Sequence, residues 1–155
     1  MSADDASAAL SEIRYSLLIL GTQGEGGPHF MVANWGVQAS FEPRRFAMLL
    51  ESGSRTLAFA RKHKAFTVNL LSETQDYKPL VKDVMKRKGE GHAAQKGALD
   101  APRLPEAYAG FDCKLAKEVD VGGDHTLLVA DVVDGWTKGE GPAVVLADMK
   151  LSYAG

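Results

Sequence analysis

The chain has 155 residues, a formal net charge of −2, 45% hydrophobic residues and 25% charged residues. These proportions are typical of one globular domain and exclude a chain that is disordered throughout. The charge balance lacks the basic excess of a nucleic-acid-binding domain. One cysteine, Cys113, excludes an intrachain disulfide and a multi-thiolate metal site.

The longest apolar runs, such as Phe46–Leu50, have five residues, which is too short to cross a bilayer. The start of the chain carries Asp4 and Asp5, so it lacks the basic and apolar regions of a signal peptide. We therefore expect a cytoplasmic protein with neither a membrane nor a nucleic acid as partner.

Short apolar stretches separated by glycine clusters predict a protein built mainly of strands. Residues 1–12 are expected to form a flexible lead-in, followed by a single domain over residues 13–155. Between two of the strands, Asn34–Ser40 is small, polar and expected to be irregular. In chain order, the expected strands are Tyr15–Leu20, Phe30–Ala33, Phe46–Glu51, Phe66–Leu70, Lys114–Val121, Thr126–Val133 and Ala143–Ala147.

Two segments break the strand pattern and predict helices. Ser54–His63 contains no Gly or Pro, begins with a capping serine and ends in cations that suit a helix C-terminus. Ser72 followed by Gln75 matches a capping box, and apolar residues at helical spacing continue to Lys88-Gly89. Many short strands with two helices favour a small β-barrel with helical additions.

The sequence does not support a dinucleotide-binding fingerprint, a histidine metal site or a cysteine nucleophile. Gly89–Ala94 matches the letters of a dinucleotide-binding fingerprint, but it follows an expected helix instead of a strand. The four histidines are scattered along the chain, so no metal site is predicted. Cys113 is expected to be a small core residue.

Three other segments carry groups that suit a ligand, and each also has a purely structural explanation. Ser54-Arg55-Thr56 would form an anion site at a helix start, or simply a capped helix with a solvated arginine. Asn34–Ser40 surrounds Trp35 with amides and small residues, which suits a flat polar heterocycle or a Trp-anchored barrel corner. Gly122-Gly123 suits a hairpin turn, which leaves the following Asp124-His125 unexplained.

In their order and separation these segments resemble the flavin reductase-like, FMN-binding split-barrel family, which includes flavin reductases of two-component monooxygenases and flavoredoxin-like proteins. The resemblance extends from about Ile13 to Tyr153. It implies a fold that is mainly β with helical additions, namely an FMN-binding split β-barrel. The blocks that carry it are Val32–Trp35 with Gln38–Pro43, then Ser54–Thr56, Ala65–Glu73, Phe111–Leu115, Gly123–Leu127 and Val132–Asp134.

The resemblance also implies a role for individual residues. The flavin ring would lie along Asn34, Trp35, Gly36, Val37, Gln38, Ala39 and Ser40. Its phosphate would be held by Ser54, Arg55 and Thr56, and His125 would lie near the face where a nicotinamide docks. The implied cofactor is FMN, with FAD left open, the implied donor is NAD(P)H, and the implied assembly is a homodimer.

We therefore predict an enzyme, an NAD(P)H-dependent flavin reductase that passes reduced flavin or electrons to a monooxygenase or another acceptor. The alternative is an FMN-bound electron-transfer protein without its own NAD(P)H turnover. A third possibility is a binding or structural dimer that has kept the barrel and lost turnover. The presence of His125 favours the enzyme. The segment Gly91–Gly97 lacks the aromatic residue that family members often place after the second helix, which favours the others.

Overall fold

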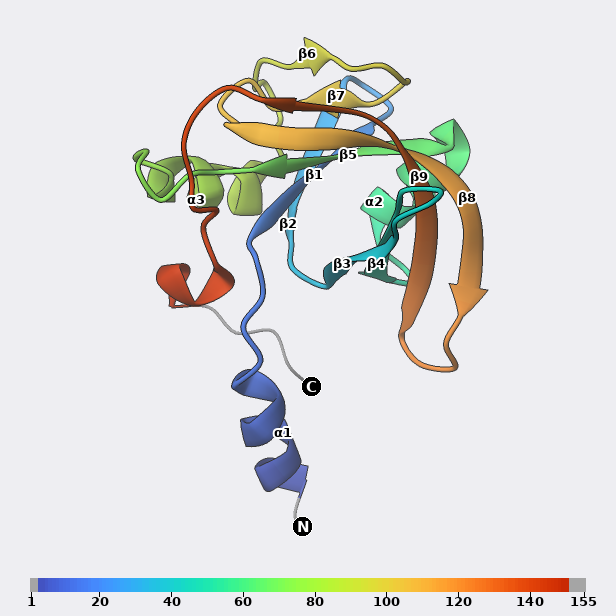
Figure 1. Cartoon of the computed structure of the whole chain (residues 1–155), viewed down its shortest axis with the longest axis vertical. Helices are drawn as coiled ribbons and strands as arrows, with labels where there is room; N and C mark the ends of the chain where they lie inside the picture. The colour runs from blue at the N-terminus through green and yellow to red at the C-terminus, as the bar shows by residue number, and fades with distance from the viewer. Residues whose placement is uncertain (1–2, 151–155) are drawn as a thin grey trace.

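The computed structural model of the protein describes residues 3–150, and a seven-stranded antiparallel sheet forms its body (Figure 1). The spatial order of the strands is β2-β1-β5-β8-β9-β4-β3, which leaves β2 and β3 as the edges. The sheet curls on itself, and the expected split β-barrel is confirmed. The strands are β1 Leu18–Gln23, β2 Pro28–Ala33, β3 Gly36–Ser40, β4 Arg45–Glu51, β5 Ala65–Leu70, β8 Ala109–Asp120 and β9 His125–Thr137, with a separate pair β6 Gln95–Lys96 and β7 Pro102–Arg103.

Both expected helices are present, and the second begins at a later residue than predicted. Helix α2 spans Arg55–His63, and the Ser54 side chain accepts a hydrogen bond from the backbone N–H of Leu57, as a capping serine does. Helix α3 spans Lys78–Arg87 and begins later than expected. The amide oxygen of Gln75 does accept from the Ser72 N–H at 2.7 Å, but this closes a turn before the helix.

Ser72 is held outside α3 by contacts with the end of the chain. It forms an isolated antiparallel bridge with Ala143, and its hydroxyl donates to the carbonyl of Glu140. The expected strand at Ala143–Ala147 is wrong, because this segment makes only single bridges and continues into a 3₁₀ helix over Leu146–Met149. Pro142 precedes it and brings no N–H to a ladder.

Two other expectations differ from the structure. The segment expected to be irregular contains strand β3, which pairs with β4 in the register Gly36↔Met48. A Cβ on Gly36 would lie 2.5 Å from Phe46, so the residue permits a close approach of the two strands. The lead-in forms helix α1 over Ala3–Ser11, and its flexibility stays a prediction.

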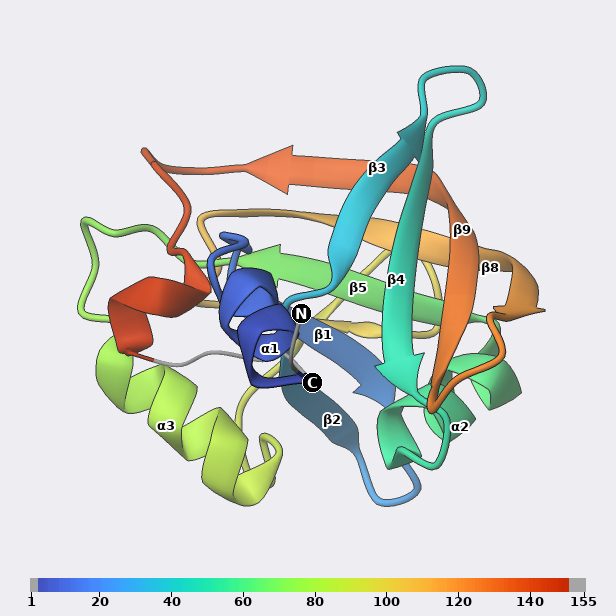
Figure 2. The same cartoon turned by 90° about the horizontal axis from the view of Figure 1, so that it is seen from below.

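Two apolar clusters lie on either side of β1. Leu18 and Leu20 pack inside the barrel with residues of β4, β5 and α2. Leu17 and Ile19 pack with α3 and the 3₁₀ segment. Because successive side chains of a strand point to opposite faces, this one segment contributes to both apolar clusters. Figure 2 shows the outcome: α3 and α2 lie on opposite sides of β2, and the β3–β4 hairpin projects from the body.

Candidate functional site

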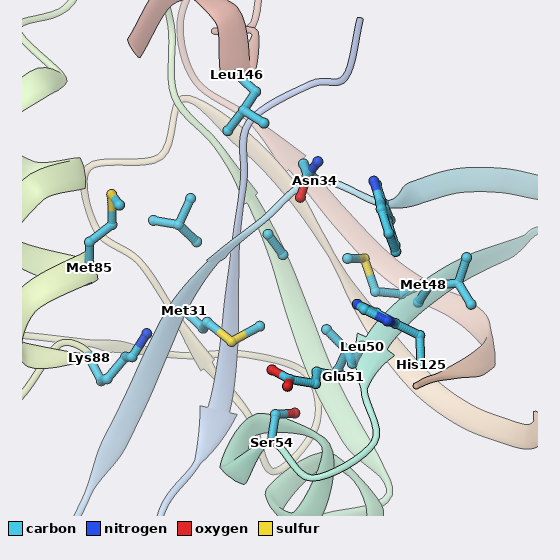
Figure 3. Close-up of a pocket in the computed structure, with 14 residues that line it drawn as sticks. Met31, Asn34, Met48, Leu50, Glu51, Ser54, Met85, Lys88, His125 and Leu146 are labelled. Carbon is cyan, nitrogen blue, oxygen red and sulfur yellow. The ribbon is translucent and has the colours of Figure 1, made fainter. Parts of the chain in front are cut away.

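A cavity of about 330 Å³ opens between β2, β4, the start of α2 and the side of α3 (Figure 3). Its walls are mostly apolar with a few polar groups, the usual character of a cofactor or small-molecule site. Residues of five separated chain segments line it: Met31, Val32, Ala33, Asn34, Trp35, Met48, Leu49, Leu50, Glu51, Ser54, Met85, Lys88, His125 and Leu146.

The free edge of β2 supplies backbone groups to this cavity. In an antiparallel strand, successive residues direct their N–H and C=O groups to alternate sides. The N–H of Phe30 turns away from β1 and donates to the carbonyl of Lys88 at 2.9 Å. Val32 faces the same way, and its backbone forms no hydrogen bond at this edge within residues 3–150. It therefore offers one donor and one acceptor to a ligand.

Asn34 adds a polar group at the end of β2. Its side chain is buried and lines the cavity, and its Nδ2 has no hydrogen-bond partner among the described residues. Leaving a buried donor unpaired costs about 1–3 kcal/mol, so the position suits a ligand that brings an acceptor. A flat heterocycle with a polar edge fits this donor set.

Trp35 and His125 form the side of the cavity opposite α3. Their ring centroids are 4.6 Å apart, with the planes tilted by 45°. His125 is the first residue of β9 and pairs with Glu51 of β4, which fixes it above the pocket. Its Nδ1 lies 2.6 Å from the Asp124 carboxylate, and this hydrogen bond and the histidine's charge lower the pKa of Asp124. Asp124 thus orients the ring of His125.

The side chains of Ser54, Arg55 and Thr56 point in different directions. Ser54 lines the cavity, whereas the buried Thr56 hydroxyl donates to Met31 Sδ at 3.1 Å and lies 2.9 Å from His29 Nε2. The Arg55 guanidinium lies 5.5 Å from the Phe59 ring centroid, in a neighbouring cavity. The N–H groups of Arg55 and Thr56 have no acceptor in the part of the chain that the structure describes, so the helix start can still bind an anion.

The structure brings only some of the predicted site residues together. Asn34, Trp35, Ser54 and His125 line one cavity, while Gly36, Val37, Gln38, Ala39 and Ser40 lie on β3 and do not line it. Their proposed contact with a flavin stays a prediction. The sequence analysis did not predict the other lining residues as part of a site: Met31, Val32, Ala33, Met48, Leu49, Leu50, Glu51, Met85, Lys88 and Leu146. Only Lys88 carried a local signal, as a cation at a helix end.

Other classes of site find no support in the described residues. Over residues 3–150 no group of three His, Cys, Asp or Glu side chains could hold a metal ion. None of the helices in that span is long and apolar enough to cross a membrane. Cys113 is fully buried in the barrel core, as expected, and burial raises the pKa of its thiol.

The sequence pattern of the family described as "Flavin reductase like domain" matches residues 10–154. The chain belongs to the flavin reductase-like family. Among curated relatives, the FMN reductase (NADH) RutF of Enterobacter cloacae is 28% identical over 81% of this chain and 77% of its own. Diflavin flavoprotein A 1 of Synechocystis is 27% identical over 84% of this chain. The chain spans only 24% of that protein, and about a quarter of the other diflavin flavoproteins that it matches.

A solved structure supports the same relationship. The styrene monooxygenase flavin reductase SMOB of Pseudomonas putida S12 is 26% identical, with a TM-score of 0.75 over 92% of this chain and 91% of the other. The cavity of Asn34, Trp35, Ser54 and His125 is therefore the candidate ligand site of a member of this family.

Proposed function

We propose that this flavin reductase-like protein is an NAD(P)H:flavin oxidoreductase that binds FMN in the cavity of Figure 3. One observation carries the proposal: an unpaired buried amide, a free strand edge and a helix start with unpaired N–H groups meet in one largely apolar cavity. The relative from Enterobacter cloacae, which is named an NADH-dependent FMN reductase, supports this choice of reaction.

Each wall of the cavity has a distinct task in this proposal. The backbone of Val32 and the Nδ2 of Asn34 bind the polar edge of the flavin ring, and Met31, Met48 and Leu50 exclude water from its apolar part. The start of α2 binds the phosphate. When bound, FMN supplies the chemistry of accepting a hydride, and the protein contributes position and electrostatic field.

In this proposal, His125 meets the nicotinamide donor. It lines the cavity beside Trp35, and its hydrogen bond to Asp124 fixes the orientation of its ring. In the proposed reaction it binds and orients the donor, and it is not required as an acid. The electrons then pass to a monooxygenase or another acceptor. The proposal includes either NADH or NADPH as the donor.

The expected homodimer and the cytoplasmic location stay part of this proposal. The β3–β4 hairpin projects from the barrel and carries Val37 at 63% exposure and Phe41 at 88%. Exposed apolar side chains on a projecting hairpin are well suited to a second copy of the chain. We expect a homodimer with a two-fold interface of more than about 2,000 Å². Light scattering of the FMN-loaded protein tests the dimer through its molar mass.

A second candidate is an FMN-bound electron-transfer protein that another reductase supplies. On the α3 side the cavity is lined by Met85 and Lys88, and neither offers an aromatic surface for stacking a nicotinamide. The diflavin flavoproteins in which this domain is only a part also favour this role.

Mixing the purified protein with FMN and then with NADH or NADPH under anaerobic conditions distinguishes the two. A reductase oxidises the donor, so the nicotinamide absorbance band falls with that of the oxidised flavin. Bound FMN together with an unchanged nicotinamide band would contradict the reductase and favour the electron carrier.

A further inference from the structure

The wall of the candidate cavity is rich in thioether groups, and the proposed function uses none of their sulfur chemistry. Three of the five methionines of the chain line it, namely Met31 on β2, Met48 on β4 and Met85 on α3. Figure 3 shows their sulfur atoms around the same space. Oxidation converts the apolar thioether of methionine into a polar sulfoxide, so this wall can change its chemical character.

The three sulfur atoms differ in access and in hydrogen bonding. Met48 is only 1% exposed and belongs to the barrel core. Met31 is partly buried, and its Sδ accepts a hydrogen bond from the Thr56 hydroxyl at 3.1 Å, which occupies electron density that oxidation would use. Met85 is 43% exposed, and its sulfur accepts no hydrogen bond from any residue in the span 3–150. An oxidant in solution should therefore react with Met85 first.

The thiol of the chain does not compete for this oxidant. Cys113 is the only cysteine, and it is fully buried in the barrel core. Burial raises the pKa of its thiol, so the reactive thiolate does not form near neutral pH. Among residues 3–150, Met85 has the most exposed sulfur-containing side chain.

The position of Met85 on α3 connects its oxidation to ligand binding. Val81 and Val84 are fully buried and fix the helix against the body, and Met85 follows them at the edge of the cavity. A sulfoxide oxygen at this edge can be hydrated as long as no ligand covers it. A ligand that fills the cavity would remove that water, and burial of a polar group without a partner costs free energy. Oxidation should therefore weaken the ligand more than it weakens the fold.

We propose that Met85 is a site of oxidation by hydrogen peroxide, and that its sulfoxide weakens binding of the flavin whose reoxidation forms the peroxide. The inference rests on the proposed function, which supplies the oxidant. Dioxygen that takes two electrons and two protons from reduced flavin becomes hydrogen peroxide. A lone pair of the Met85 sulfur then takes one oxygen atom as the O–O bond breaks, and the products are the sulfoxide and water. Loss of electrons to oxygen thus releases flavin from the protein.

Hydrogen peroxide added in limiting amounts to the flavin-free protein tests the order of oxidation. Mass spectrometry of peptides should find the sulfoxide first at Met85, later at Met31 and last at Met48. Titration of flavin fluorescence should then show FMN binding about three- to tenfold weaker than before treatment. The two methionine sulfoxide reductases, one for each epimer, should restore it. Oxidation of Met31 or Met48 ahead of Met85 would overturn the inference.

Met85→Leu removes the sulfur and keeps an apolar side chain of similar volume. Met149→Leu is the matched control, because Met149 packs against the apolar cluster beneath α3 and does not line the cavity. Each variant is compared with its own untreated sample. Peroxide should leave the FMN affinity of Met85→Leu unchanged and weaken that of Met149→Leu as in the parent protein. The same weakening in Met85→Leu as in the parent would overturn the assignment.

Added peroxide and peroxide from turnover keep this inference distinguishable from the proposed function. Selective oxidation of Met85 with weaker FMN binding supports the site even if NADH is not oxidised, a result that would refute the reductase alone. In the FMN-loaded protein, NADH in air should produce the Met85 sulfoxide, and NADH without oxygen should not. Oxidation of NADH in air without this sulfoxide, or with it and an unchanged FMN affinity, would overturn the inference and leave the reductase intact.

Discussion

Replacing Arg55 by alanine separates recognition of the flavin phosphate from recognition of the ring. Arg55 is the first residue of α2, where the helix dipole and the unpaired N–H groups of Arg55 and Thr56 attract an anion. Alanine keeps these N–H groups and removes only the guanidinium, which we expect to reach the phosphate from the neighbouring cavity. A hydrogen bond to a charged group contributes about 1.5–3 kcal/mol, which corresponds to about a 10- to 150-fold loss of FMN affinity. Riboflavin has the same ring without the phosphate, so its affinity should stay unchanged.

The assay is a parallel titration of FMN and riboflavin against the parent protein and Arg55→Ala, with quenching of flavin fluorescence as the readout. Arg61→Ala is the control on the same helix, because Arg61 pairs with Glu118 and lines neither cavity. Raising the salt concentration should reduce the FMN advantage of the parent protein. If both ligands weaken equally in Arg55→Ala, or if FMN is unaffected, the assignment of the phosphate to α2 is refuted.

Three further predictions follow from the contacts of single side chains. His125→Ala should lower kcat/KM for NAD(P)H about 5- to 50-fold, mainly through KM, in stopped-flow reduction at several donor concentrations, and unchanged donor kinetics would make the residue structural. Arg103→Met leaves the fully buried Asp112 without its ion pair and should lower the free energy of unfolding by about 3–5 kcal/mol in urea, with partial recovery when Asp112→Asn is added. The pKa of His29 is lowered in the folded state, so below the ordinary value of 6.5 the unfolded chain binds more protons than the folded chain. Stability should therefore fall as pH drops through 6.5. Thermal unfolding of His29→Gln should show a weaker pH dependence.

Local signals explain the parts of the structure that could be predicted from the sequence. The capping serine of α2 and the glycines of the β8–β9 turn act over a few residues, so the chain itself reveals them. Strand β3 was missed because it depends on pairing with β4 and on the close approach at Gly36. The apolar run Ala143–Ala147 was mistaken for a strand because its missing ladder partner is a long-range property.

The candidate site shows the same division. Trp35, Asn34, Ser54 and His125 were found through segment resemblance, and the structure brings them to one cavity. Met31 and Met85 enter that cavity only because α3 packs beside β2, which no local pattern indicates. His29 looked like one of several scattered histidines, and its burial against Phe59 follows from the fold.

The free edge of β2 has a consequence for the colloidal behaviour of the protein. An exposed strand edge is a template on which another chain can add a strand. Along β2 the carbonyl of Lys88 covers Phe30, while Val32 has only the cavity and the neighbouring α3 beside it. A ligand bound along Val32 therefore shields the edge from edge-to-edge association. The N–H and C=O of Val32 would thus bind the cofactor and, when unoccupied, be open to another strand. Flavin-depleted protein should therefore aggregate faster on storage than the loaded form.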